Sequence, residues 1–221
     1  MIETITFKDT KYPKFQSEHF AAQFVFPFAD KILKGIGFDI GYGEPEWILP
    51  DNAKRSVIGI EKDRYLEWKS EKADELIATM RTEETKFDAC FLPVFDDPID
   101  FIFSSHCLEH IAAPPFEVLN YWYTRLATEG ILFLYLPDFS QKYWRPWHNS
   151  KHKHVITRKI IKTYLNESGK WTNVFVSGVD LNNSFVAIAE KVQMDSYATG
   201  KTCKQLTTIK TNSSNVAGNN D

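Results

Sequence analysis

The chain has 221 residues, of which 43% are hydrophobic, and this composition is typical of one soluble globular domain with a sizeable core. A formal net charge of −3 excludes the strong basic field that recruits nucleic acid, so we expect no nucleic-acid partner. Cys90, Cys107 and Cys203 lack CxxC spacing, which argues against a disulfide framework or a zinc ribbon and favours a reducing, cytoplasmic location. We expect neither a signal peptide nor a membrane span, because no apolar run approaches the roughly 20 residues that a span needs.

Hydrophobic periodicity and turn residues predict strands that alternate with helices. In chain order we expect a strand at 2–8, a helix at 19–33, strands at 35–40 and 57–60 around a brief helix at 45–49, a helix at 65–80, strands at 87–91 and 100–104, a helix at 115–127, a strand at 130–136, a helix at 157–169, and an antiparallel hairpin of 173–179 and 184–190. This alternation predicts an α/β protein with a mostly parallel sheet and helices on both faces. Residues 1–192 are expected to form the domain, and the polar residues 193–221 a disordered tail.

Acidic residues lie near the ends of the expected strands. Asp39 lies in a Gly-rich turn, Asp39-Ile40-Gly41-Tyr42-Gly43, and Glu61 closes the next strand about 20 residues later. Ligands of such sheets bind at the carboxyl ends of the strands, so Glu61 is placed to bind a ribose diol. A dinucleotide fits poorly, because Glu44 and Glu46 would repel its pyrophosphate and Glu46 replaces the last glycine of the G-x-G-x-x-G pattern.

The motifs resemble those of class I S-adenosylmethionine-dependent methyltransferases, specifically the type 11 group. Asp39-x-Gly41-x-Gly43 matches the first motif, with Pro45 in place of the third glycine, and Glu61 matches the acid after the second strand. Further matches are DACFLP at 88–93, DFIFSSHCLEHI at 100–111 and GILFLYLP at 130–137. The resemblance covers roughly residues 35–190. It implies a Rossmann-like, mostly parallel seven-stranded sheet with a C-terminal antiparallel hairpin.

The resemblance also implies S-adenosyl-L-methionine as the cofactor. Asp39 and Gly41 would lie by its methionine moiety, Glu61 would bind the ribose hydroxyls, and Asp88 would address the adenine amino group. Ser104, Ser105 and His106 would lie beside the methyl group. The full set of implied cofactor-binding residues is Asp39, Gly41, Tyr42, Gly43, Glu61, Asp88, Ala89, Ser104 and Ser105.

A long segment after the fifth apolar strand is the candidate acceptor site, because long insertions in compact domains are usually functional. Its aromatic and cationic side chains suit a sugar or a phosphorylated small molecule, although a solvated basic loop is the alternative. The candidate acceptor-binding residues are Tyr143, Trp144, Arg145, Trp147, His148 and His152. The spacing of His148, His152 and His154 also suits a metal, but only Asp138 is a nearby carboxylate, so no metal is assigned.

Methyl transfer to a hydroxyl requires a base, and neutral histidine is the usual one near pH 7. The candidates are His106, His110 and His154, with His106 favoured for its position. Ser104-Ser105-His106-Cys107 replaces the N/D-P-P-aromatic motif of the enzymes that methylate base amines. The sequence therefore favours O-methylation of a sugar, a glycan or another small molecule. An inactive methyltransferase-like binding subunit is the alternative, and a nicotinamide-dependent oxidoreductase is a weaker one.

Overall fold

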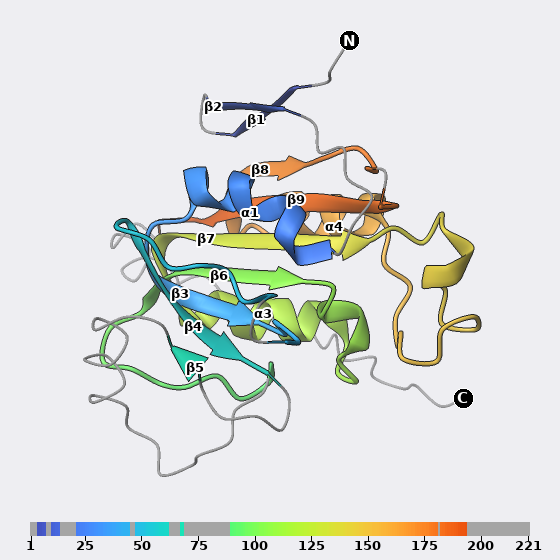
Figure 1. Ribbon diagram of the computed structural model, residues 1–221, viewed down its shortest axis with the longest axis horizontal. Coiled ribbons are helices and arrows are strands. Elements are labelled where there is room, and N and C mark those ends of the chain that lie inside the picture. The colour runs from blue at the N-terminus through green and yellow to red at the C-terminus, as the bar shows by residue number, and fades with distance from the viewer. Residues whose placement is uncertain are drawn as a thin grey trace, which may run out of the picture.

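The computed structural model describes residues 4–7, 10–13, 21–44, 47–61, 67–68, 89–180 and 182–193. Its main feature is a seven-stranded sheet in the order β5-β4-β3-β6-β7-β9-β8 (Figure 1). The strands of this sheet are β3 (Gly35–Ile40), β4 (Arg55–Ile60), β5 (Glu67–Trp68), β6 (Ile99–Ser105), β7 (Leu126–Pro137), β8 (Trp171–Val176) and β9 (Ser184–Lys191). A separate antiparallel pair consists of β1 (Thr4–Phe7) and β2 (Thr10–Pro13), so the expected N-terminal strand does not extend the main sheet.

The strand directions confirm the predicted architecture. β3 pairs in parallel with both β4 and β6, and β6 pairs in parallel with β7. β9 is antiparallel to both β7 and β8, which gives the predicted C-terminal hairpin. The carboxyl ends of the parallel strands therefore meet at one edge of the sheet, where the predicted site residues follow them.

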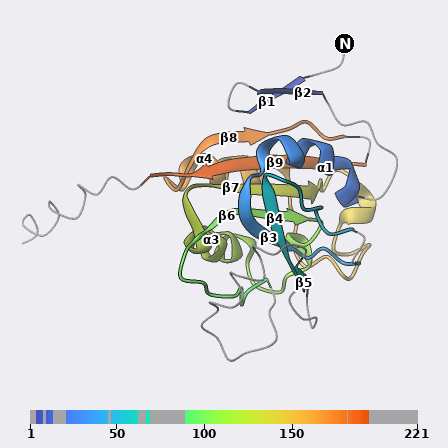
Figure 2. The ribbon, with the colours of Figure 1, turned by 60° about the vertical axis from the view of Figure 1, so that its left-hand side comes forward.

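Helices cover both faces of the sheet, as predicted (Figure 2). α1 (Ala21–Ile32) packs on one face, and α3 (Pro115–Arg125) and α4 (Arg158–Glu167) pack on the other. Successive strand residues point to opposite faces, so Phe103 contributes to the core beneath α1 while Ile102 contributes to the core beneath α3. Both are completely buried, as expected for a strand covered on two sides. The helices of these described segments are all too short or too polar to cross a bilayer.

The region between β4 and β6 departs from the prediction. A helix was expected at 65–80, but Glu67 and Trp68 form β5, which pairs antiparallel with Ile58 and Gly59. Residues 69–80 lie outside the described part of the chain. At the strand expected over 87–91, the described residues 89–91 form a turn and a single bridge residue. Tertiary pairing along the free edge of β4 therefore overrides the local helical pattern at Glu67 and Trp68.

Two further expectations fall partly on undescribed residues. Trp47 and Ile48 form only a short turn, and residues 45–46 of the expected brief helix are not described. Residues 194–221 also lie outside the described part, so the domain boundary near residue 192 stays a prediction.

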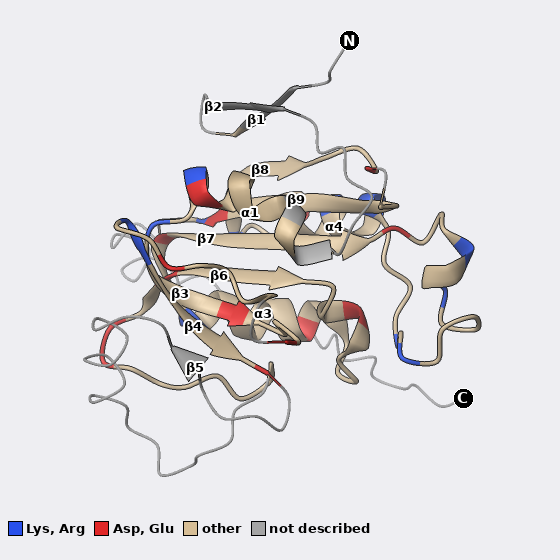
Figure 3. Ribbon diagram, viewed as in Figure 1, with Lys and Arg blue, Asp and Glu red and all other residues tan. Residues whose placement is uncertain are grey.

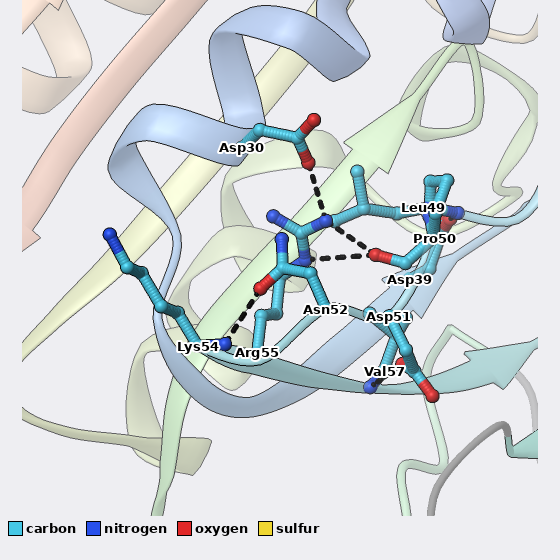
Figure 4. Close-up of polar contacts among 9 residues, drawn as sticks. All are labelled: Asp30, Asp39, Leu49, Pro50, Asp51, Asn52, Lys54, Arg55 and Val57. Atoms are coloured by element: carbon cyan, nitrogen blue, oxygen red, sulfur yellow. Dashed lines mark hydrogen bonds and ion pairs between the residues drawn. The ribbon is translucent and has the colours of Figure 1, made fainter.

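A buried arginine fixes the segment between β3 and β4 (Figure 4). Arg55 is completely buried at its side chain, and its Nη2 lies 2.6 Å from Oδ1 of Asp30, which is 49% exposed at the end of α1. The Nε of Arg55 also donates to the Pro50 carbonyl at 3.2 Å. Helix α1, the 47–54 segment and β4 are thus joined through one guanidinium group.

We predict that Asp30→Ala lowers the free energy of unfolding by about 1–2 kcal/mol, because it leaves the buried Arg55 charge without its carboxylate partner. Urea denaturation measures this change. The control is Asp97→Ala at an exposed site, which we expect to change stability by less than about 0.5 kcal/mol. Equal effects of the two substitutions would show that the Arg55–Asp30 pair contributes no stability.

Candidate functional site

The Gly-rich turn leaves β3 at the carboxyl edge of the sheet. Gly41 and Gly43 have φ angles of 77° and 78°, in the left-handed region that favours glycine. A Cβ at Gly41 would lie 2.3 Å from Sγ of Cys107, so only glycine lets the segment after β6 approach the turn this closely. Burial raises the pKa of the Cys107 thiol, which therefore packs there as a neutral group.

The two acids of the first motifs hold this turn in place. Oδ2 of the buried Asp39 accepts a 2.6 Å hydrogen bond from the amide of Leu49. Oε2 of Glu61, at the end of β4, accepts a 2.8 Å hydrogen bond from the amide of Gly43. Asp39 thus anchors the segment that leaves the turn, and Glu61 fastens the turn to the neighbouring strand.

Other residues predicted to bind the cofactor have side chains that serve the fold. Tyr42 is buried in the core on the α1 side, and Ser104 donates its hydroxyl to the Ile40 carbonyl at 3.0 Å. Ser105 is also buried. The carbonyl of the half-buried Ala89 accepts a 2.7 Å hydrogen bond from the Trp122 indole. Asp88 lies outside the described residues.

His106 follows β6 with a φ of 48°, unusual for a residue other than glycine. Its Nε2 lies 2.9 Å from Oγ of Ser184, at the start of β9, and the Ser184 hydroxyl itself donates to the Asn182 carbonyl at 3.1 Å. Ser184 therefore accepts from Nε2–H, which leaves the lone pair on Nδ1. The pKa of His106 is lowered to about 3, first by burial and then by His152 and His110, so the imidazole is neutral at pH 7.

Glu109 and His110 belong to a short 3₁₀ helix, η2 (Leu108–His110). The Glu109 side chain is buried, and burial raises its pKa to about 8. Its Oε1 lies 3.7 Å from Nδ1 of His106 and 3.6 Å from Nε2 of His110. The carboxyl group therefore lies between two imidazoles, both of whose pKa values are lowered by burial.

The loop between β7 and α4 docks on this same segment. The Lys153 amide donates to the Glu109 carbonyl at 2.7 Å, and Nδ1 of His110 lies 3.0 Å from the Lys151 carbonyl. Nε2 of His154 lies 2.8 Å from the Ile111 carbonyl, so this predicted base holds the loop in place. Figure 3 shows Lys and Arg along the loop, whose two ends join β7 and α4. The docking places its tip at the carboxyl edge of the sheet.

Trp144 and His152, two of the predicted acceptor-binding residues, lie beside the candidate bases His106 and His110. The Trp144 ring stacks on the buried His152 with centroids 5.5 Å apart, and it meets the His106 ring in a T-shaped contact with centroids 5.3 Å apart. The Arg145 guanidinium lies 4.7 Å from the centre of the Phe139 ring and 5.8 Å from that of Trp147. The remaining predicted residues, Tyr143, Trp147 and His148, are exposed.

Sequence reasoning missed the neighbours of His152. It grouped this residue with Asp138, but Asp138 accepts hydrogen bonds from the Ser140 and Arg158 amides at 2.9 and 3.3 Å. His152 instead lies beside His110, with ring centroids 4.7 Å apart, and the carboxyl group that joins them is that of Glu109. The LEH signature was visible in the sequence, but nothing in its spacing pointed to the loop.

We predict that Gly41→Ala destabilises the protein more than Gly169→Ala does. Both glycines have a positive φ, and a Cβ at Gly169 would meet nothing within 4 Å, so its replacement costs only the conformational strain of about 1–2 kcal/mol. At Gly41 the clash with Cys107 adds about 1–3 kcal/mol. Urea denaturation of both variants tests this, and equal losses would mean that Cys107 moves aside freely.

No protein-family model matches the chain, and no curated protein matches it. Solved structures do resemble it. A SAM-dependent methyltransferase from Thermotoga maritima, a possible histamine N-methyltransferase, superposes with a TM-score of 0.51 at 17% identity over 76% of this chain and 87% of that one. The putative methyltransferase in a complex with the Trm112 activator from Haloferax volcanii gives 0.50 at 14% identity, over 72% and 84%. An O-methyltransferase family protein from Burkholderia thailandensis gives 0.50 at 12% identity, over 79% and 59%. The chain therefore has the fold of class I S-adenosylmethionine-dependent methyltransferases.

Proposed function

We propose that the protein is an S-adenosylmethionine-dependent methyltransferase that methylates a hydroxyl group of a sugar, a glycan or another small molecule. The observation that carries this proposal is the Gly41–Gly43 turn at the carboxyl end of β3, fastened by Glu61 at the end of β4. In open α/β sheets this edge is where nucleotide-like ligands bind. The fold alone would not support this proposal, because one fold can host many different functions.

The residues around the turn fit such a cofactor. Gly41 and Gly43 present backbone without side chains, so a ligand can approach closely. Glu61 is half-buried and fixed by the Gly43 amide, which suits a carboxylate that binds two ribose hydroxyls. Because Tyr42, Ser104 and Ser105 have buried side chains, we assign their part in binding to backbone atoms and to the shape of the turn. Asp88 and Ala89 remain our candidates for the adenine side.

When bound, the cofactor supplies an electrophilic methyl group on a sulfonium. The chain then has to hold the acceptor hydroxyl in line with that methyl group, and such positioning can contribute about 7–11 kcal/mol in ideal cases. His106 is our candidate base, because it is neutral and its Nδ1 has a lone pair while Nε2 is held by Ser184. The carboxyl group of Glu109 lies between His106 and His110, the second candidate base. His154 would act by holding the loop in place.

The loop between β7 and α4 is our candidate acceptor site. Trp144 links it directly to His106, so an acceptor lying on the loop would be next to the base. The exposed rings of Tyr143 and Trp147 can pack on the apolar face of a sugar. Arg145, His148 and His152 add polar groups for its hydroxyls or for a phosphate.

We expect Glu61→Ala to weaken binding of S-adenosylhomocysteine by about tenfold or more, because a charged hydrogen bond is worth about 1.5–3 kcal/mol. Isothermal titration calorimetry measures the affinity. Glu44→Ala, an exposed acid of the same turn, is the matched control and should bind nearly as well as the wild type. Wild-type protein that binds NAD but not S-adenosylhomocysteine would refute the proposed cofactor.

Trp147→Ala should raise the KM for the acceptor and leave S-adenosylhomocysteine affinity unchanged, because the exposed ring belongs to the loop alone. The assay follows a labelled methyl group from the cofactor onto a panel of glycans, nucleotide sugars and phenols. Ile160→Ala, which removes an exposed apolar side chain from α4, is the control. Full activity of Trp147→Ala on the true acceptor would show that this part of the loop is a solvated surface with no role in acceptor binding.

His106→Ala should lower kcat by about 10²–10⁴-fold with little change in either affinity, since a base acts in the transition state. The same labelled-methyl assay and calorimetry provide both measurements. If the wild type binds the cofactor but methylates no acceptor of any class, the inactive binding subunit becomes the better explanation.

A further inference from the structure

Three side chains with metal-binding atoms converge beside His106. Glu109, His110 and His152 each offer one such atom, and these atoms all lie within 4.8 Å of one another. Glu109 and His110 come from η2, and His152 comes from the loop between β7 and α4. The loop's hydrogen bonds to Glu109 and His110 hold the two segments together, so the cluster is built by the fold and is not an accident of surface side chains.

Both histidines of the cluster have the tautomer that a metal site needs. Nδ1 of His110 lies 3.0 Å from the Lys151 carbonyl, and Nδ1 of His152 lies 2.8 Å from the Trp144 carbonyl. A carbonyl only accepts, so each Nδ1 bears the proton and each Nε2 has a free lone pair. Metal-binding histidines typically donate their second ring nitrogen to a backbone carbonyl in this way.

The state of the Glu109 side chain is the strongest evidence that the cluster binds a ligand. It is completely buried, and within the described residues neither of its side-chain oxygens has a hydrogen-bond partner. A buried polar group without a partner is costly, and native proteins rarely leave one in this state. A cation bound by Glu109, His110 and His152, whose ligand atoms all lie within 4.8 Å of one another, would satisfy all three groups together.

We propose that Glu109, His110 and His152 bind a divalent transition-metal ion of the zinc type. Two imidazoles and one carboxylate suit Zn²⁺ and its neighbours, whereas Mg²⁺ and Ca²⁺ prefer all-oxygen sites. Nε2 of His110 and Oε1 of Glu109 lie 3.6 Å apart, a separation that suits two ligand atoms about 2.0–2.2 Å from one Zn²⁺. The His110 side chain is 38% exposed and opens the site to solvent.

Three protein ligands leave a coordination position for a substrate oxygen. This consequence rests on the proposed function: the acceptor hydroxyl binds the ion, which lowers its pKa. The hydroxyl proton passes to Nδ1 of His106, 3.7 Å from Oε1 of Glu109. The oxygen forms its bond to the methyl carbon as the carbon–sulfur bond breaks, and that electron pair remains on sulfur.

The test titrates ZnCl₂ into the chelator-stripped full-length protein by calorimetry, with MgCl₂ as the comparison. We expect one Zn²⁺ per chain, and binding at least about tenfold weaker in Glu109→Gln and in His152→Gln. His148→Gln, an exposed histidine of the same loop, is the matched control and should keep wild-type Zn²⁺ affinity. Circular dichroism verifies that each variant is folded, and His110→Gln provides a third ligand variant should one of the others fail to fold.

Co²⁺ provides a spectroscopic readout that does not depend on activity, because its visible absorption reports nitrogen and oxygen coordination. Wild type and His148→Gln should show the same Co²⁺ bands, and the ligand variants should lose them. Absence of saturable Zn²⁺ binding, or wild-type affinity in both Glu109→Gln and His152→Gln, would overturn the metal site. Zn²⁺ binding without S-adenosylhomocysteine binding would uphold the metal site and refute the proposed function. S-adenosylhomocysteine binding without Zn²⁺ binding would overturn the metal site and leave the proposed function to the methylation assay.

Discussion

The close contact between Gly41 and Cys107 is the constraint on which the rest of the site depends. With no Cβ at Gly41, the segment that follows β6 lies directly against the turn that follows β3. That segment contains His106 and Glu109, and the loop between β7 and α4 docks on it. Because Gly41 has no Cβ, the candidate cofactor turn and the segment on which the candidate acceptor loop docks can pack together.

The elements that the sequence predicts well are those whose surroundings are uniform. β3 has the predicted bounds of 35–40, because a mostly apolar run, as expected of a strand covered on both faces, ends at the glycines that follow Ile40. α4 begins after Thr157, whose side chain accepts from the Ile160 amide, and Gly169 follows its end with a positive φ. β5 could not be predicted in this way, since two residues on a sheet edge depend on their partner strand and on no local period.

The candidate site was predictable only in part for a similar reason. Asp39 and Glu61 stand at fixed distances from a glycine motif, and the structure places Asp39 in β3 just before the turn and Glu61 at the end of β4, bonded to the turn. The neighbourhood of His152 with Glu109 and His110 depends on backbone hydrogen bonds between distant segments, such as that from the Lys153 amide to the Glu109 carbonyl. Backbone hydrogen-bonding groups are nearly the same at every residue, so no sequence pattern predicts such a contact.

The hydrogen bond from His106 to Ser184 has a consequence for how the protein is made. Ser184 opens β9, the last strand of the sheet in chain order, although it lies between β7 and β8 in space. A chain emerging from the ribosome can therefore build β3, β4, β6 and β7 while the His106 ring still lacks the partner that fixes its tautomer. Insertion of β9 completes the sheet and orients this imidazole in one event. Nascent chains, and chains truncated before β9, are thus expected to lack the hydrogen bond that fixes the His106 tautomer.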